Sequence, residues 1–283
     1  MSNSVVDDGD GPSILHCFAD YGVESEILSW YGDVIRVGIN AHDTNESELI
    51  TADANILEDS KDWDIPFKDD VTFDLGVFHP VCSKWASTTS ISGDPDDHTN
   101  MIPSARSIAE RYCDHYVIEN VPRAPLDDPT VLDGRMFGLP IKYERAFETS
   151  FDVPQPPRYQ RFWGKDGEND TAETSSFFFT ERSRKWWASV KNVPPRRYPK
   201  QHLAKNTIPA PYIHHVCRAW LTVYEDDNDI DYSDYDQRME TQRQQQANRS
   251  LSDFVSGWDE PRGEEATDGN LEEILSSVEE EDD

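Results

Sequence analysis

The chain has 283 residues, with 56 Asp and Glu against 26 Lys and Arg, and a formal net charge of −30. Hydrophobic residues make up 36% of it, which is enough for one sizeable core and a smaller appendage or tail. The acidic start is unlike a secretory signal, no apolar run approaches the roughly 18 residues of a membrane span, and the four scattered cysteines fit neither a disulfide framework nor a zinc motif. We therefore expect a soluble, cytoplasmic monomer.

Short apolar runs alternate with helical patterns from residue 14 onward. The spacing of apolar residues predicts four strands and three helices. In chain order these are strand 14–19, helix 23–31, strand 34–39, strand 73–78, helix 103–113, strand 115–119 and helix 209–222. Strands that alternate with helices imply an α/β fold with a parallel sheet and ligands at the carboxyl ends of its strands.

Composition divides the chain into five parts. The alternating pattern fills 13–152, after a polar N-terminus (1–12) that we expect to be disordered. Prolines, a run of three Phe and basic residues set 153–200 apart as a small module. Residues 201–224 carry the late helix, which returns to the main domain, and the acidic, Gln-rich segment 225–283 is expected to be mostly disordered.

The negative charge is unevenly distributed along the chain. Residues 225–283 carry a net charge of −17, whereas 158–205 carry +6. Within 182–205 there are eight basic residues and no acidic one, interleaved with aromatic rings. A solvated basic loop is one interpretation; we favour a surface that tracks phosphates and stacks bases. The expected contacts with nucleic acid are Arg182, Arg184, Lys185, Trp186, Trp187, Arg196, Arg197 and Lys200, with Tyr198 as a further stacking ring.

Three reactive or charged side chains follow or flank the expected strands. Cys82, in HPVCSKWAS, comes after strand 73–78, Glu119 opens the triplet ENV at the end of the next strand, and Arg145 lies in FGLPIKYERAFET. Each alone has a plain explanation, since a lone Cys is usually buried and a lone Glu or Arg usually lies on the surface. A doubly wound sheet would bring Cys82 and Glu119 together at one edge. The eight His residues show no spacing typical of paired ligands, so no metal is expected.

The order FADYG, HPVC, ENV, ERAFE and KNTIP resembles that of the DNA methyltransferases that modify carbon 5 of cytosine, most of all the short versions carried by viruses of microbes. The resemblance covers about 14–222, and its most specific stretch is ENVPRAPLDDPTVLDGRMFGLPIKYERAFET. It implies a Rossmann-like, S-adenosylmethionine-dependent methyltransferase sheet, a catalytic domain over 13–152 and a target-recognition module inserted at 153–200. Double-stranded DNA would be the partner, in a microbial or host cytoplasm, where a restriction enzyme can accompany such a protein.

The resemblance assigns a role to each reactive residue. Cys82 would add its thiolate to carbon 6 of a flipped-out cytosine, so that carbon 5 can attack the methyl group. Glu119, with a pKa raised by burial, would hydrogen-bond or protonate ring nitrogen 3, and Arg145 would hold the ring oxygen. The positions that match cofactor contacts are Phe18, Gly22, Asp53, Pro80 and Asn206.

Several positions depart from the family pattern. Asp20 stands where a glycine is usual, and its side chain would crowd the methionine part of the cofactor. The acidic residue that usually grips the ribose aligns with Gly38, which leaves Asn40 or Asp43 as substitutes. The other departures are Val81, Ser83 and Tyr143. They motivate one alternative, a DNA-binding protein on a methyltransferase scaffold with weakened catalysis.

Two further hypotheses concern chemistry and partners. Methyl transfer to an exocyclic amine is a third interpretation, but that chemistry usually uses an Asp/Asn-Pro-Pro-aromatic site without a nucleophilic Cys. In the tail, NRSLSDFV (248–255) resembles a sliding-clamp binding box, so a clamp is a candidate partner. The excess of acidic residues, with more Arg than Lys, would suit the salty cytoplasm of a halophile, where charge repulsion is screened.

Overall fold

The computed structural model describes residues 11–40, 42, 47–51, 71–86, 89, 93–139, 141–157, 182–194 and 198–228. Several predictions fall outside these ranges. They concern Asp43, Asp53, Arg196, Arg197, most of the N-terminal segment 1–12, the clamp-binding box at 248–255 and nearly all of the acidic tail.

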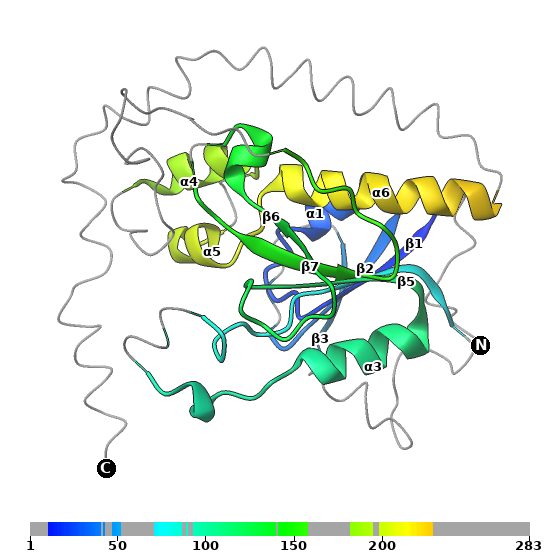
Figure 1. The fold of residues 1–283 in the computed structure, drawn as a ribbon, viewed down its shortest axis with the longest axis horizontal. Helices are drawn as coiled ribbons and strands as arrows, with labels where there is room; N and C mark the ends of the chain where they lie inside the picture. Colours follow the sequence, from blue (N-terminus) through cyan, green and yellow to red (C-terminus); the bar gives the residue numbers. More distant parts are fainter. Residues whose placement is uncertain are drawn as a thin grey trace.

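Seven strands form one mixed sheet in the order β3-β2-β1-β4-β5-β7-β6 (Figure 1). Neighbours from β3 to β5 are parallel, and β7 runs antiparallel to both β5 and β6. The strands are β1 (Ser13–Cys17), β2 (Asp33–Gly38), β3 (Glu48–Thr51), β4 (Phe73–Phe78), β5 (Cys113–Asn120), β6 (Thr130–Leu132) and β7 (Arg145–Thr149). The predicted α/β class with a Rossmann-like sheet is confirmed, and the strand order reverses between β1 and β4, where such sheets bind ligands.

Helices cover both faces of this sheet (Figure 1). The helix α3 (Ile102–Tyr112) lies on one face. The other face carries α1 (Ser25–Leu28), α4 (Arg184–Lys191), α5 (Lys200–Lys205) and α6 (Ala210–Asn228). Two short 3₁₀ turns, η2 (Pro95–Asp97) and η3 (Gly134–Phe137), lie in the connections. None of the helices in the described part of the chain is long and apolar enough to cross a membrane.

The core consists of two apolar clusters, one on each face of the sheet. Ile14 and Leu15 are neighbours in β1 but belong to opposite clusters, and so do Val117 and Ile118 in β5. Successive side chains of a strand point to opposite faces, so a sheet covered on both sides reads as a continuous apolar run. This is why these strands stand out in the sequence.

The predicted elements differ from the observed ones mainly at ends and edges. The strand at 73–78 agrees fully, and the other three agree within about two residues at each end. The strands β3, β6 and β7 were not predicted, since β3 and β6 have only four and three residues and the charged Arg145 and Glu148 interrupt the apolar pattern of β7. The helix expected over 23–31 is only the single turn α1, whereas α6 continues to Asn228, because extending a formed helix gains one hydrogen bond per residue.

The aromatic residues of the basic stretch belong to the main core. Trp186, Trp187 and Tyr198 are 4%, 0% and 1% exposed and pack in the same cluster as the strands. Their enclosed rings leave no face for a base, so the prediction that they stack on nucleic acid is wrong. A mixture of basic and aromatic residues also describes an amphipathic helix, and α4 buries its Trp face while Arg184 and Lys185 stay exposed. The division of 153–200 as a separate module stays a prediction.

Lys191, one of the eight basic residues in 182–205, does not lie on the surface either. Its side chain is fully buried, and its Nζ donates to the carbonyl oxygens of Ala204 (2.9 Å) and Thr207 (2.7 Å). The same ammonium lies 3.7 Å from the centre of the Tyr143 ring. Burial, followed by the charge of Arg145, lowers its pKa well below the ordinary value. Lys191 therefore ties α4 to the segment around α5 rather than contacting phosphate.

Buried His214 makes stability depend on pH. Its Nδ1 lies 2.7 Å from Tyr31 Oη, and burial together with Arg218 lowers its pKa to about 4. The unfolded chain therefore binds a proton between roughly pH 6.5 and pH 4 that the folded chain does not, so stability is lost as the pH falls. This group should lower the free energy of unfolding by about 2 kcal/mol between pH 7 and pH 5. Guanidinium denaturation at both values checks this, and an equal fall in His214→Asn would contradict it.

Candidate active site

A cavity of about 280 Å³ opens where the parallel strands end. It is lined by residues 18–22 after β1, residues 79–83 after β4, Glu119 near the end of β5, and Arg145 at the start of β7. His202 and Asn206, in and after α5, close another side. The cavity lies at the switch point between β1 and β4, where a doubly wound sheet leaves a crevice.

The turn after β1 is held in an unusual backbone conformation. Phe18 has a φ of 59° and Gly22 a φ of 60°, both in the left-handed region. For a residue with a bulky side chain, such as Phe18, this region is sparsely populated and is typically kept where a loop must fit a ligand. The Ala19 amide donates to Val37 O (3.0 Å), which holds the strained turn against β2.

Asn120 positions the loop that carries Cys82. Its Nδ2 donates to the carbonyl oxygen of Pro80 at 2.8 Å, although 40 residues separate the two in sequence. Beyond this tie, the amides of Trp85 and Ala86 both donate to Cys82 O at 2.9 Å, so a tight turn begins at the cysteine. The Cys82 thiol is free and partly exposed to the cavity. The Asn of the ENV triplet thus fixes where the cysteine stands.

Sheet register brings Glu119 and Arg145 together. Glu119 faces Phe147 across the antiparallel β5–β7 pair, and Arg145 is two residues from Phe147 on the same face. Such diagonal neighbours lie within reach of long side chains. Arg145 Nε donates to Glu119 Oε1, and both side chains are almost completely buried. On the other side, His79 Nδ1 lies 2.9 Å from Glu119 Oε2.

This arrangement keeps Glu119 ionised. Burial alone would raise the pKa of Glu119, but Arg145 and the His79 hydrogen bond outweigh it and lower that pKa. Burial alone would likewise lower the pKa of Arg145, but the Glu119 carboxylate raises it far above its ordinary value. The sequence-based expectation of a raised Glu119 pKa is therefore wrong for this state, because the sequence did not show that Arg145 and His79 both contact the carboxylate.

Asp20 and Gly38, two of the departures noted above, are complementary in space. The Asp20 carboxylate accepts hydrogen bonds from the Ile39 amide (2.8 Å), the Asn40 amide (3.2 Å) and Asn40 Nδ2 (2.8 Å). It therefore lies at the end of β2, directly in front of Gly38. A Cβ atom at Gly38 would lie 2.9 Å from Asp20 Oδ1 and 3.0 Å from Asp20 Cα, so position 38 must be glycine while residue 20 follows this path.

Replacing Gly38 by Ala should therefore destabilise the protein. Because the new methyl group would meet Asp20 backbone as well as its side chain, we expect a loss of about 1–3 kcal/mol in the free energy of unfolding. Gly93→Ala is the matched control, since a Cβ atom there meets nothing nearer than 3.4 Å. Chemical denaturation of both variants checks this, and equal stabilities would contradict the packing of Asp20 against Gly38.

The cavity gathers most of the residues singled out from the sequence. Those lining it are Cys82, Glu119, Arg145, Phe18, Gly22, Pro80 and Asn206. Among the expected DNA contacts, Arg184 and Lys185 are exposed on α4, while Arg182 and Lys200 are half-buried. The guanidinium of Arg182 lies 5.4 Å from the centre of the Trp186 ring. The roles of all these residues remain predictions.

Sequence reasoning missed the histidines and aromatic rings around the cavity. The sequence marks His79 only as part of HPVC, yet its side chain is hydrogen-bonded to Glu119. Tyr21 stacks on His42 at 4.1 Å between ring centres and lies 4.3 Å from the ring of His202. His79 directly follows the six-residue strand β4, and a polar ring at the end of a buried strand was the one signal that would have marked it.

No protein-family model matches the sequence, and neither does any curated protein. Among solved structures, the chain is similar to a candidate DNA modification methyltransferase encoded within an E. coli prophage, at 16% identity and a TM-score of 0.39, covering 51% of this chain and 49% of that one. It is also similar to the methyltransferase EhMeth of Entamoeba histolytica, at 8% identity and a TM-score of 0.45, covering 77% and 99%. The chain thus spans about half the length of the prophage protein.

At these identities the likeness concerns the fold alone. The sheet is Rossmann-like, as expected from the sequence, and β7 is inserted antiparallel between β5 and β6. Any activity of this chain has to be argued from its own residues.

Proposed function

We propose that this protein transfers a methyl group from S-adenosylmethionine to carbon 5 of cytosine in DNA. The observation that carries the proposal is the convergence of the Cys82 thiol with the buried Glu119–Arg145 pair in one cavity at the switch point of the sheet. A free thiol, a carboxylate and a guanidinium are the three groups that this chemistry requires around one pyrimidine ring.

The residues at the carboxyl ends of β1 and β2 suit S-adenosylmethionine. All five residues of the strained turn 18–22, Phe18 included, line the cavity. Asp20 presents a carboxylate at the end of β2, where Gly38 has no side chain, so Asp20 would make the contact with the ribose hydroxyls in place of Asn40 or Asp43. Pro80 and Asn206 would border the cofactor from the other sides, and Asp53 remains a candidate for the adenine. When bound, the cofactor supplies an electrophilic methyl group.

Cys82 would begin the reaction as a thiolate. Its sulfur forms a bond to carbon 6 of a cytosine flipped out of the duplex, and the ring electrons move toward carbon 5 and nitrogen 3. Carbon 5 would then take the methyl group, and the electrons of the broken methyl–sulfur bond would stay on the departing donor. A solvent water molecule would take the proton from carbon 5, and the electrons of that C–H bond would restore the ring double bond and expel the Cys82 thiolate. Atoms and electrons balance with solvent water as the proton acceptor.

Glu119 and Arg145 would change partners when the base enters. Arg145 would turn to the ring oxygen of cytosine, which removes the positive charge that lowers the Glu119 pKa. Glu119, still buried, then takes up a proton and donates it in a hydrogen bond to ring nitrogen 3. His79 holds the second carboxylate oxygen and thereby keeps Glu119 in place. Glu119 and Arg145 would thus form an ion pair in the free protein and separate when the substrate base binds.

The exposed basic residues at the start of α4 would contact phosphate. Arg184 and Lys185 project to solvent from a helix whose opposite face is anchored in the core. Charged side chains on such a rigid element hold DNA in register without reading its sequence. Arg196, Arg197 and Lys200 stay candidates for further contacts, and no residue is assigned to base recognition.

The test is to identify the methylated nucleoside. Full-length protein, duplex DNA and S-adenosylmethionine carrying a labelled methyl group are incubated, and the DNA is digested for mass spectrometry. We expect label in 5-methylcytosine with wild type and none with Cys82→Ser. Label in an exocyclic amine of cytosine or adenine would overturn the carbon 5 assignment. DNA binding without any calorimetric heat from S-adenosylmethionine would instead support the alternative of a scaffold that no longer turns over.

A further inference from the structure

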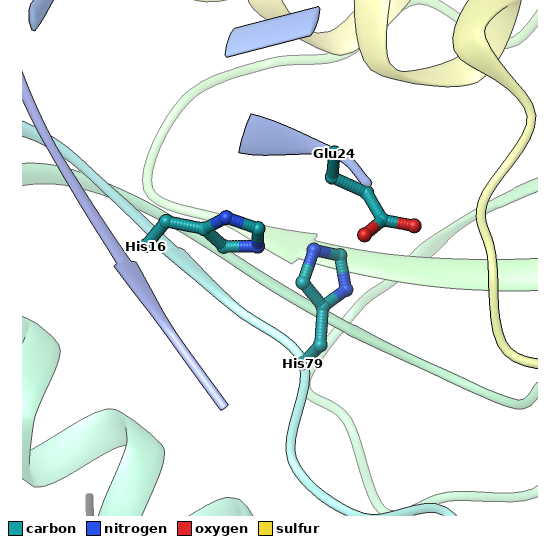
Figure 2. A group of neighbouring side chains, drawn as sticks. All are labelled: His16, Glu24 and His79. Carbon is teal, nitrogen blue, oxygen red and sulfur yellow. The ribbon is translucent and has the colours of Figure 1, made fainter. Parts of the chain in front are cut away.

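Three potential metal ligands meet at the cavity wall: His16 from β1, Glu24 just before α1, and His79 just after β4 (Figure 2). One ligand atom from each lies within 4.8 Å of the other two. His16 faces Val77 across the β1–β4 pair, and His79 is two residues beyond Val77, so sheet register places both imidazoles on the same face. Their ring centres are 5.0 Å apart, with the rings nearly perpendicular.

In both His16 and His79, one ring nitrogen has a hydrogen-bond partner and the other has none in the described part of the chain. His16 Nδ1 lies 2.6 Å from Ser25 Oγ, and His79 Nδ1 lies 2.9 Å from Glu119 Oε2. Within the described part of the chain, neither Nε2 has a hydrogen-bond partner, and neither is reached by solvent. An unsatisfied buried polar group costs about 1–3 kcal/mol, so two facing each other need an explanation.

The bonded nitrogens fix which tautomer His79 adopts. A carboxylate oxygen accepts hydrogen bonds, so the 2.9 Å contact makes His79 Nδ1 the donor and Glu119 Oε2 the acceptor. The other ring nitrogen, His79 Nε2, points toward His16 and Glu24 and is the atom that could bind an ion (Figure 2). A carboxylate on the far nitrogen is the usual support for a metal-binding histidine.

The geometry points to a site for a divalent transition metal ion of the Zn²⁺ type, bound by His16 Nε2, His79 Nε2 and the Glu24 carboxylate. Two imidazole nitrogens and one carboxylate oxygen form a donor set that Zn²⁺ accepts in four-coordinate sites. Glu24 Oε1 accepts from the Ile208 amide at 2.7 Å, so the carboxylate is oriented and keeps lone pairs for the ion. Glu24 and His79 also line the cavity, so a fourth coordination position would face it.

The three proposed ligands lie too far apart in the sequence to form a recognisable metal-binding motif. They come from two strand ends and a loop, 8 and 55 residues apart, so no spacing along the chain marks them. A bound ion would join the carboxyl ends of β1 and β4 to the start of α1 and hold the cavity floor together. It would also fix the His79 ring that supports Glu119, a consequence that rests on the function proposed above.

Metal binding is testable without any enzymatic activity. Full-length protein is treated with a chelator, dialysed, and titrated with Zn²⁺, with Co²⁺ as a spectroscopic probe. We expect one ion per chain, visible Co²⁺ bands of a four- or five-coordinate site, and a rise in thermal stability. His16→Asn and Glu24→Gln should weaken Zn²⁺ binding by at least roughly 10–100-fold, the range that even supporting residues show. His214→Asn is the matched control, since His214 is also buried with an unpartnered Nε2.

Each contrary outcome overturns the assignment. If wild type binds no stoichiometric Zn²⁺, or if His16→Asn binds Zn²⁺ with the same affinity as wild type, the proposed site does not exist. Loss of binding in Cys82→Ser, with the histidine variants unaffected, would place the ion on the thiolate instead. If NMR of the protein shows one proton shared between the two Nε2 atoms, and added Zn²⁺ leaves that signal unchanged, a histidine–histidine hydrogen bond accounts for the cluster. Denaturation curves confirm that each variant compared is folded.

Discussion

Glu119→Gln is expected to lower the rate of methyl transfer by roughly 10²–10⁴-fold, the usual contribution of a positioned acid. The amide cannot give a proton to ring nitrogen 3 of the base. It also leaves the buried Arg145 without its counter-charge, which should reduce the free energy of unfolding by about 3–5 kcal/mol. The rate is measured per folded molecule, with the folded fraction taken from circular dichroism under the assay conditions.

Glu148→Gln is the control that separates chemistry from stability. Glu148 lies on β7 like Arg145, is 3% exposed, and accepts two hydrogen bonds from Arg106 at 2.7 and 2.6 Å. Its partner Arg106 is partly exposed, so losing the charge should cost less, about 1–3 kcal/mol. The methyl-transfer rate per folded molecule should be unchanged. An equal loss of rate in both variants would mean that Glu119 acts only through folding.

Trp187→Ala should destabilise the protein by about 3–5 kcal/mol, the range for emptying a large aromatic site in a core. The side chain is fully buried, packs edge-to-face on Trp186 with ring centres 4.9 Å apart, and lies beside the Lys191 ammonium. Chemical denaturation of the variant measures the loss. If Trp187 instead stacked on a base, the variant would keep its stability and lose about 1–3 kcal/mol of DNA affinity.

The double variant Arg184→Ala and Lys185→Ala tests the opposite face of the same helix. Both side chains are exposed, so stability should change by no more than about 0.5 kcal/mol. DNA binding should weaken, and the slope of log affinity against log salt should become shallower by about 0.9 for each phosphate that the variant no longer neutralises. An unchanged slope would mean that α4 does not contact the DNA phosphates.

The parallel part of the fold followed from the sequence because its strands are buried on both faces. The strand at 73–78 could be placed to the residue, and the alternation of strands with helices implied the sheet edge where Cys82 and Glu119 meet. The antiparallel β7 could not be foreseen, although it carries Arg145, because the charged residues Arg145 and Glu148 interrupt its apolar pattern. That Arg145 reaches Glu119 is a matter of register between two strands, which no local pattern encodes.

Composition also failed to distinguish exposed side chains from buried ones. Trp187 and Lys191 stand among exposed basic residues in the sequence, yet both are fully buried, because α4 turns one face to the core. The pKa of Glu119 could not be predicted either, since burial and the two cationic or donor partners shift it in opposite directions. The sequence predicted that Asp20 would crowd the cofactor. In the structure its carboxylate instead binds the amides of Ile39 and Asn40 and lies in front of Gly38.

The central claim is that Cys82 attacks carbon 6 of cytosine, and DNA containing 5-fluorocytosine tests it most directly. Fluorine at carbon 5 cannot leave as a proton does, so the bond between Cys82 and the base persists after methyl transfer. With S-adenosylmethionine and high salt, wild type should form a complex that survives denaturation, and mass spectrometry should place the cross-link on the Cys82 peptide. Cys113→Ser, which alters another free cysteine, should form the same complex. Absence of the complex in wild type, or its formation by Cys82→Ser, would contradict the mechanism.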